Sequence, residues 1–161
     1  MSKQYFFIGL FIIGFFVQCG ETPVYRQDQN LLSGWELNNT LRFTLPENGN
    51  GPLDVYVHLR NDQNYPFANI FLIISVKEGD SLRERDTLEY AMAKPNGEWL
   101  GTGFSSVKES RLEWKKNWEY NGETPPVVEI AQANRTNGRE KAAEVLPGIL
   151  SVGLSVELLE E

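Results

Sequence analysis

Most of the chain alternates between apolar and polar residues with the two-residue period of β-strands. The alternation is clearest in residues 53–60, where every second residue is apolar. Residues 41–45 alternate in the same way and end at Pro46, whereas residues 70–76 are almost continuously apolar, as in a central strand. Four further segments have a strand-like pattern: residues 87–92, 111–120, 127–133 and 149–158.

The segments between these strands are rich in turn-forming residues. Residues 47–52 read ENGNGP and residues 94–103 read KPNGEWLGTG, and both compositions favour turns. One short helix is predicted over residues 139–146, because Pro147 and Gly148 would end it. Seven or eight short strands with turn-rich links and one small helix predict an all-β fold. The expected architecture is an antiparallel β-sandwich of jelly-roll-like or Ig-like topology, whose strand order the sequence leaves open.

The first twenty residues differ from the rest of the chain in being mostly apolar. Lys3 is the only charged residue among them, and residues 5–17 form an uninterrupted apolar run. As a helix this run would span roughly 20 Å, which is short of the roughly 30 Å hydrocarbon core of a bilayer. A short apolar run behind a positive charge is typical of a signal peptide, so we expect residues 1–18 to be removed.

Cys19, the only cysteine of the chain, stands where this apolar run ends. Residues 16–19 resemble the cleavage box of bacterial lipoproteins, although Gln18 stands where a small residue is typical. In such proteins the cysteine becomes the N-terminus and carries acyl chains, two or more of which suffice for stable anchoring. An ordinary secretory signal with a chance cysteine, or an uncleaved short anchor, is the alternative. We therefore expect a lipidated cysteine and tether over residues 19–30 and a single β-sandwich domain over residues 31–161.

The composition restricts the classes of function. A formal net charge of −7 argues against a nucleic-acid-binding protein, because phosphate binding needs clustered lysines and arginines. A single cysteine excludes a disulfide within the chain and a cysteine-based zinc site. An apolar content of 41% is that of a globular protein. No cofactor is indicated.

Residues suited to catalysis or metal binding are few. His58, the only histidine, falls on the strand face opposite the apolar residues of 53–60, so a surface or second-layer histidine is favoured over a general base. Asp62 and Asp86 stand near predicted strand ends. If they lay close together they would suit glycoside cleavage; the favoured interpretation is that they shape turns. The oxygen-rich loop of residues 62–67 has too few carboxylates for a calcium site to be expected. We expect no catalytic residues, no metal site and no enzyme activity.

Aromatic residues leave two interpretations open. Sandwich domains that bind glycans stack exposed tryptophan and tyrosine rings on sugars, so a surface glycan-binding lipoprotein is the alternative function. The same rings would fill the core of a small sandwich, and this second interpretation is favoured. The residues concerned are Trp35, Trp99, Trp114, Trp118, Tyr56, Tyr65 and Tyr90.

In three segments of the chain, the identities of the residues, and not only the spacing of apolar positions, are informative. These segments are residues 59–76 (LRNDQNYPFANIFLIISV), 86–117 (DTLEYAMAKPNGEWLGTGFSSVKESRLEWKKN) and 146–157 (LPGILSVGLSVE). Together with the N-terminal cysteine box they resemble the gliding motility lipoprotein GldH family, over nearly the whole mature chain. The resemblance implies a lipid-anchored cell-envelope protein that is required for gliding motility and has no catalytic activity.

The resemblance also implies partners and a location. Such a protein would be a structural or assembly component of the gliding apparatus and, with it, of the type IX secretion machinery. Its partners would be other envelope proteins of these machineries, and its N-terminal lipid would attach it to the membrane. We expect the outer membrane, with the domain facing the periplasm. Cys19 is the one functional residue that the resemblance transfers.

The loop around residues 61–67 is the candidate partner surface. Pro66 would stiffen this loop, and the rings of Tyr65 and Phe67 would serve as anchors of the kind found at interface hot spots. The alternative is that both rings fold back and cap the end of the sandwich. The candidate residues are Asn61, Asp62, Asn64, Tyr65, Pro66 and Phe67.

Two short motifs concern modification. Residues 80–82 read Asp-Ser-Leu and residues 86–88 read Asp-Thr-Leu. Both resemble a short O-glycosylation acceptor pattern that some gliding bacteria use. Three-residue patterns often occur by chance, so the sequence leaves open whether Ser81 or Thr87 is glycosylated.

Overall fold

The computed structural model describes residues 24–46, 51–103, 105–135 and 142–158. In these residues the chain forms ten β-strands and no helix. The strands are β1 (Tyr25–Asn30), β2 (Trp35–Glu36), β3 (Leu41–Thr44), β4 (Leu53–Asn61), β5 (Asn69–Glu78), β6 (Ser81–Ala91), β7 (Lys108–Trp118), β8 (Val127–Gln132), β9 (Val145–Leu146) and β10 (Ile149–Leu158). Accordingly, no helix in the described part of the chain is long and apolar enough to cross a membrane.

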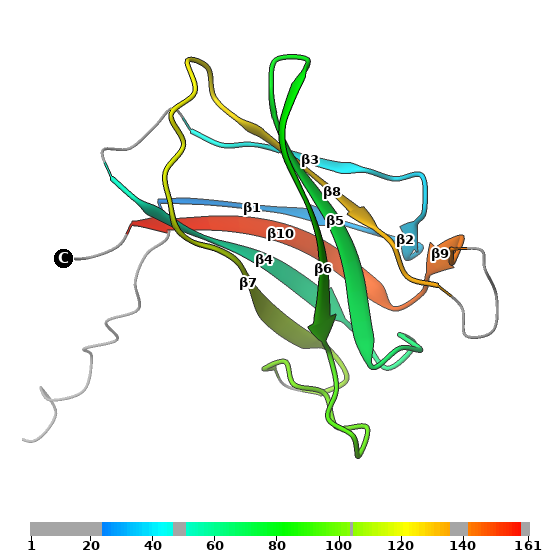
Figure 1. The fold of residues 1–161 in the computed structure, drawn as a ribbon. Coiled ribbons are helices and arrows are strands. Elements are labelled where there is room, and N and C mark those ends of the chain that lie inside the picture. The colour runs from blue at the N-terminus through cyan, green and yellow to red at the C-terminus, as the bar shows by residue number, and fades with distance from the viewer. Residues whose placement is uncertain (1–23, 47–50, 104, 136–141, 159–161) are drawn as a thin grey trace, which may run out of the picture.

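Eight of the strands form two antiparallel four-stranded sheets that pack face to face (Figure 1). Sheet I has the order β1-β10-β4-β7, and sheet II has the order β3-β8-β5-β6; the short strands β2 and β9 pair with each other. Along the chain, every connection between the eight longer strands crosses to the other sheet, except the hairpin between β5 and β6. This is the arrangement of a jelly roll. The predicted antiparallel β-sandwich is confirmed, in its jelly-roll form.

The core lies between the two sheets and follows the alternation in the sequence. Four residues of β5 point inward and are fully buried: Ile70, Leu72, Ile74 and Val76. The apolar face of β4 that the sequence predicts belongs to the same buried cluster. Burying an aliphatic side chain of this size contributes roughly 1.5–3 kcal/mol relative to exposure, so these alternating positions are a main source of stability.

Side-chain bonds close the two lateral sides of the sandwich. Between β1 and β3, Gln29 Nε2 donates to the backbone carbonyl of Arg42 at 2.7 Å. Between β6 and β7, the Tyr90 hydroxyl donates to the backbone carbonyl of Glu113 at 2.7 Å. Each bond satisfies a carbonyl on an edge strand, where unpaired backbone groups would otherwise invite pairing with another chain.

The side between β6 and β7 also holds two inward tryptophans of β7. Trp114 Nε1 donates to Asp86 at 2.9 Å, and Trp118 Nε1 donates to Glu84 at 3.3 Å. Lys115 forms ion pairs of 2.9 Å with both carboxylates. A bulge leaves Trp114 without a partner residue on β4, so Trp114 and its neighbour Lys115 both reach β6.

Residues 142–146, the described part of the predicted helix, are not helical. Val145–Leu146 is strand β9, and it pairs with Trp35–Glu36. Leu146 and Trp35 are fully buried, so the packing of this ribbon outweighs a weak local preference for helix. The remaining part of the predicted helix, residues 139–141, lies outside the described residues.

The tether predicted over residues 19–30 is shorter than expected. Tyr25–Asn30 forms β1, which pairs with β10 from Tyr25 opposite Val156 to Asn30 opposite Ser151. β1 is an edge strand, and most of its residues are exposed and polar on both faces. The segment therefore lacks the alternation by which the other strands were recognised.

Candidate functional surfaces

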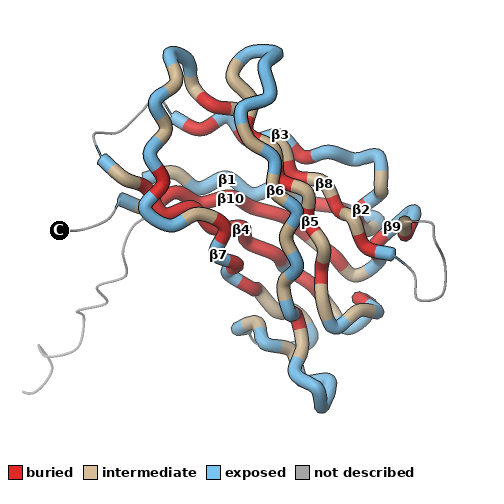
Figure 2. Tube along the Cα trace, viewed as in Figure 1, coloured by how far each residue is buried: buried red, intermediate tan, exposed pale blue. Residues whose placement is uncertain are grey.

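The outward face of sheet I is a layer of polar side chains. The register places two rows across β1, β10, β4 and β7: Asp28, Gly153, His58 and Arg111, followed by Arg26, Ser155, Tyr56 and Glu113. Eight of the nine residues of β4 are buried, on its outward as well as its inward face. Figure 2 shows most of this strand in the colour of buried residues. Asp54, Tyr56 and His58 are each only 5% exposed, although they point away from the core.

One half of this layer is built on Asp54. Its carboxylate accepts hydrogen bonds from Lys116 Nζ, from the backbone N–H of Asn117 at 3.0 Å and from the Tyr56 hydroxyl at 3.2 Å. Burial alone would raise the pKa of Asp54, but these donors more than offset burial and hold that pKa below its usual value. The guanidinium of Arg111 lies 3.4 Å from the centre of the Tyr56 ring, a cation–π contact that covers the ring.

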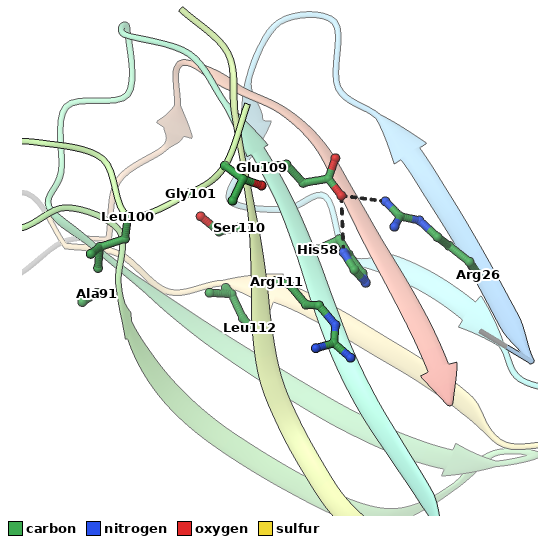
Figure 3. A pocket seen from close by; sticks show the side chains of 10 residues that line it. Arg26, His58, Ala91, Leu100, Gly101, Glu109, Ser110, Arg111 and Leu112 are labelled. Atoms are coloured by element: carbon green, nitrogen blue, oxygen red, sulfur yellow. Dashed lines mark hydrogen bonds and ion pairs between the residues drawn. The ribbon is translucent and has the colours of Figure 1, made fainter. Parts of the chain in front are cut away.

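The other half of the layer is centred on His58 (Figure 3). Its Nε2 lies 2.7 Å from Ser155 Oγ, and its Nδ1 lies 3.5 Å from Glu109 Oε1. Arg26 pairs with the same oxygen of Glu109 at 2.8 Å. Burial, and then the positive charge of Arg26, lower the pKa of His58, so the ring is neutral at neutral pH.

Ser155, His58 and Glu109 stand in the order of a serine–histidine–acid triad. A catalytic serine must approach the carbonyl carbon of its substrate. Ser155 is 1% exposed and lies within β10, with Arg26 opposite on β1 and Tyr56 opposite on β4. No substrate can therefore reach its hydroxyl in this structure, and the three side chains join strands β10, β4 and β7.

A hollow of about 550 Å³ lies beside His58, along β7 (Figure 3). Its two arginines are paired with acidic neighbours: Arg26 with Asp28 and Glu109, and Arg111 with Glu157. Because these charges are compensated within the face, the hollow presents few groups that would gain a partner from a ligand.

The outward face of sheet II differs at the end where β5 begins. Phe71 and Ile73 of β5, Ala133 after β8 and Phe67 of the preceding loop are half-buried and line a hollow of about 520 Å³, here called the sheet II hollow. Its other lining residues are Asn69, Thr87, Asn134 and Arg135. An outward face of an antiparallel sheet is usually polar, so this apolar floor is a departure from the common pattern.

The six residues predicted as a partner surface are not equally accessible. The structure places them as follows: Asn61 and Tyr65 are buried, Asp62 and Phe67 are half-buried, and Asn64 and Pro66 are exposed. The Tyr65 hydroxyl donates to the carbonyl of Asn69 at 2.8 Å, and burial raises the pKa of this hydroxyl. The Tyr65 ring meets Phe67 edge-on at 5.7 Å and Trp99 at 6.1 Å, between ring centres. Tyr65 therefore caps this end of the sandwich, whereas Phe67 reaches the sheet II hollow.

Asp62 shapes the turn that precedes Tyr65. Its carboxylate accepts hydrogen bonds from the backbone N–H of Asn64 at 2.8 Å and from Asn64 Nδ2 at 3.0 Å. Its own N–H donates to the carbonyl of Gly148 at 2.9 Å. Gly148 has a φ of +77°, and a Cβ there would lie 2.2 Å from the Tyr65 nitrogen, so only glycine fits. Within the described ranges, no three histidine, cysteine, aspartate or glutamate residues are grouped so that they could hold a metal ion.

The sequence did not indicate the role of Asn134. This residue links Tyr65, after the Asp62 turn, to strands β5 and β8 of sheet II. Its Oδ1 accepts from the backbone N–H of Phe71 at 2.8 Å, and its Nδ2 donates to the Tyr65 hydroxyl and to the Asn69 carbonyl, both at 3.3 Å. Its backbone N–H donates to Gln132 Oε1 at 3.1 Å. The alternation of the sequence could have indicated this role. Gln132 and Asn134 occupy every second position after the buried apolar residues of β8, so both point inward although they are polar.

Most of the indole rings considered for glycan binding are buried. Trp35 is fully buried, and Trp114 and Trp118 are each 8% exposed. Trp99 is half-buried and packs against Tyr65. Three of the four indoles are therefore not available for stacking on a sugar.

Asp62 and Asp86 do not form a pair. Asp86 lies within β6 and bonds to Trp114 and Lys115, whereas Asp62 bonds within its own turn. Burial alone would raise the pKa of Asp86, but its two donors hold that pKa below its usual value. The two carboxylates thus serve separate structural contacts.

Comparison with known proteins identifies the family. A family model described as GldH lipoprotein matches residues 23–156. A relative from Christiangramia forsetii, named "Gliding motility lipoprotein GldH homolog", is 37% identical over 152 residues, which cover 94% of this chain and 93% of the relative. A relative from Flavobacterium johnsoniae, named "Gliding motility lipoprotein GldH", is 35% identical over 140 residues, which cover 86% of this chain and 87% of the relative.

Among solved structures, a fructofuranosidase variant from Schwanniomyces occidentalis, complexed with fructosylnystose, is similar with a TM-score of 0.40 and 9% identity. The similarity covers 86% of this chain but 34% of that one, and at this score it supports no conclusion about function. The match to the family, by contrast, includes every described strand except the last residues of β10. The resemblance seen in the sequence is confirmed, and this chain belongs to the GldH lipoprotein family.

Proposed function

We propose that this protein is a lipid-anchored component of the cell envelope that is required for gliding motility. In this proposal it is a non-catalytic structural or assembly subunit of the gliding and type IX secretion apparatus, and its partners are other envelope proteins of these machineries. The family match over residues 23–156 carries the proposal, because it includes almost the entire folded domain. The names of both relatives refer to gliding motility.

The anchor in this proposal is an acylated Cys19. It stands six residues before Tyr25, so an extended linker would reach at most about 20 Å. β1 begins beside the end of β10, where Tyr25 lies opposite Val156. This end of the sandwich would therefore be held close to the bilayer, which we propose is the outer membrane, with the domain in the periplasm.

The polar layer of sheet I supports a role without catalysis. Ser155 is buried, and His58 is held between Ser155 and Glu109. These three side chains have the residue types of a catalytic triad, but here they form contacts between strands.

Complementation of a deletion strain tests the proposed function. Wild type, Cys19→Ser and, as a control within the tether, Thr22→Ser would each be expressed in that strain and scored for colony spreading and for secretion. We expect the deletion to abolish both, and wild type and T22S to restore them. C19S should fail to restore either although the chain is still made. A deletion strain that spreads normally would contradict the proposal, and full rescue by C19S would contradict the role of the lipid.

A further inference from the structure

We propose that the sheet II hollow binds an acidic segment of a partner protein that also carries apolar side chains. The inference rests on the proposed function, because it names the chemistry by which an assembly subunit would hold its partner. Three observations support it: the apolar floor of the hollow, the excess of positive charge around it, and its distance from the anchored end of the domain.

The floor of the hollow is apolar although it points to solvent. Phe71 and Ile73 alternate with the buried residues of β5, so they lie on the outward face, and Ala131 lies opposite Ile73 on β8. Phe67 and Ala133 complete the floor. All of them are half-buried, which leaves apolar area that a partner would remove from water. A hollow of about 520 Å³ accommodates a few side chains rather than a whole domain.

The charge of this face is opposite to that of the chain. The outward charged residues of sheet II, with Arg135 at the end of β8, are Arg42, Lys77, Arg85, Arg135, Glu89 and Glu129. Arg42, Lys77 and Glu129 lie farther along the sheet, toward Val127. Beside the hollow, Arg85, Arg135 and Glu89 give 2 − 1 = +1, whereas the whole chain carries −7. Such a patch attracts anionic groups.

The two glutamates on this face are already engaged. Glu129 pairs with Arg42 at 2.9 Å and with Lys77 at 2.8 Å, and Glu89 accepts a hydrogen bond from Asn69 at 2.6 Å. The contacts of Glu129 lie farther along the sheet, whereas Glu89 lies beside the hollow, opposite Phe71. Neither glutamate forms an ion pair with Arg85 or Arg135 in the described part of the chain.

Arg135 lines the sheet II hollow, and Arg85 lies two residues from Thr87 on the same face of β6. Both arginines are exposed, and neither forms an ion pair with a carboxylate among the described residues. Arginine combines readily with carboxylates through two parallel hydrogen bonds. Two arginines that have no ion pair among the described residues, beside an apolar floor, therefore select a segment in which acidic residues flank apolar ones.

The position of the hollow favours a protein over the membrane to which the lipid is attached. β4 runs from Leu53, opposite Leu158, to Asn61, opposite Ile149, so it leads away from the end at which β1 begins. β5 begins at that far end, and the hollow lies along its first residues (Figure 1). An anionic lipid of the anchoring membrane would meet the opposite end of the domain first.

Site-specific photo-crosslinking in living cells tests this proposal. A photo-reactive amino acid would replace Thr87, which is exposed on the rim of the hollow. The matched control is Thr44, which is also an exposed, outward threonine of sheet II but lies at the other end, opposite Val127. Only chains that accumulate to the wild-type level in the deletion strain would be irradiated, and the crosslinked peptide would be sequenced by mass spectrometry.

We expect a crosslink from position 87 but not from position 44, to a peptide in which aspartate or glutamate flanks apolar residues. The double variant R85E/R135E should reduce the yield at least tenfold, whereas R60E/K108E, which changes the net charge equally on sheet I, should not. Crosslinks to lipid alone, to a second copy of this chain or to a peptide without acidic residues would overturn the proposal. So would equal yields from the two double variants.

The outcome is separable from that of the proposed function. If the deletion strain spreads normally but position 87 still captures an acidic segment in a charge-dependent manner, the binding surface is supported and the motility role fails. If the deletion strain does not spread, and a rescued strain gives no crosslink from position 87, the motility role stands and this surface is wrong.

Discussion

Sheet I and sheet II each turn one face away from the core, and the two faces differ in what their side chains contact. On sheet I the outward groups bond to one another across strands, as Asp54 does with Lys116 and His58 with Ser155. On sheet II, at the end where β5 begins, the outward groups are apolar, and Arg85 beside them has no carboxylate partner among the described residues. The first face pairs most of its polar groups, although His58 Nδ1 has no hydrogen bond and Arg60 has no ion pair among the described residues. The second face leaves apolar area exposed and Arg85 and Arg135 without an ion pair in the described ranges.

This difference shows two separate properties of a surface: whether its side chains are buried, and whether they are bonded to neighbouring groups. Polar residues of β4 are buried because neighbouring side chains close over them, and a buried polar network is stable only when each member has its partner. Apolar residues of the sheet II hollow stay half-exposed because nothing in the described structure closes over them. Truncation should therefore cost stability on sheet I and binding on sheet II.

The largest effect is expected on sheet I, for Asp54→Ala. The substitution removes the acceptor of three donors, and two of these belong to Asn117 and the buried Tyr56. We expect a loss of about 2–3 kcal/mol in the free energy of unfolding, measured by urea denaturation, because donors left without partners keep their desolvation cost. Glu113→Ala is the control, since that carboxylate is exposed and lies 3.8 Å from Lys116. A D54A protein as stable as E113A would show that the layer is solvated rather than interdependent.

A smaller effect is expected on sheet II, for Ile73→Ser. The side chain is half-buried and points outward, so its truncation removes only part of the stabilisation of a core isoleucine. We expect at most about 1 kcal/mol of lost stability in the same urea assay. Ser75→Ala, two residues along the same face, should leave stability unchanged. A loss as large as that of D54A would mean that the hollow is part of the core, and the contrast between the two faces would disappear.

The fold could be predicted from the sequence wherever one face of a strand is buried and the other is not. Residues 41–45 and 53–60 alternate, and both form strands close to the expected bounds. β1 escaped prediction because an edge strand needs no apolar face. The predicted helix includes β9, because the pairing partner of β9, Trp35–Glu36, is remote in the sequence and gives no local signal of a strand.

The surfaces were less predictable, because they depend on which strands become neighbours. Tyr65 is fixed by Asn134, which is 69 residues away in the chain. The burial of His58 depends on Arg26, Glu109 and Ser155, which come from three other strands. Nor could the continuous apolar run of residues 70–76 reveal that its outward members line a hollow.

The smallest effect concerns the pH dependence that His58 gives to sheet I. Burial and Arg26 lower the pKa of this ring from its ordinary value of 6.5. Between the folded pKa and pH 6.5, His58 is therefore protonated in the unfolded chain but not in the folded chain. Stability should therefore fall as the pH drops below about 6.5 and level off below the folded pKa. The losses from Asp54 and Asp86, whose folded pKa values are lowered, come only below about pH 4.

His58→Gln should remove the slope between about pH 5 and 6.5, because glutamine keeps a hydrogen-bonding group near Ser155 but cannot ionise. Urea unfolding at pH 5, 6 and 7 measures the slope, and a chain with one histidine makes its source easy to assign. Equal slopes in H58Q and wild type would place the titration elsewhere. A wild type that is itself flat over this window would mean that Glu109, 3.5 Å from Nδ1, stabilises the protonated ring as much as burial and the arginines oppose it. In that case even the one histidine of sheet I would have its charge compensated within the face, and the contrast with sheet II would be sharper still.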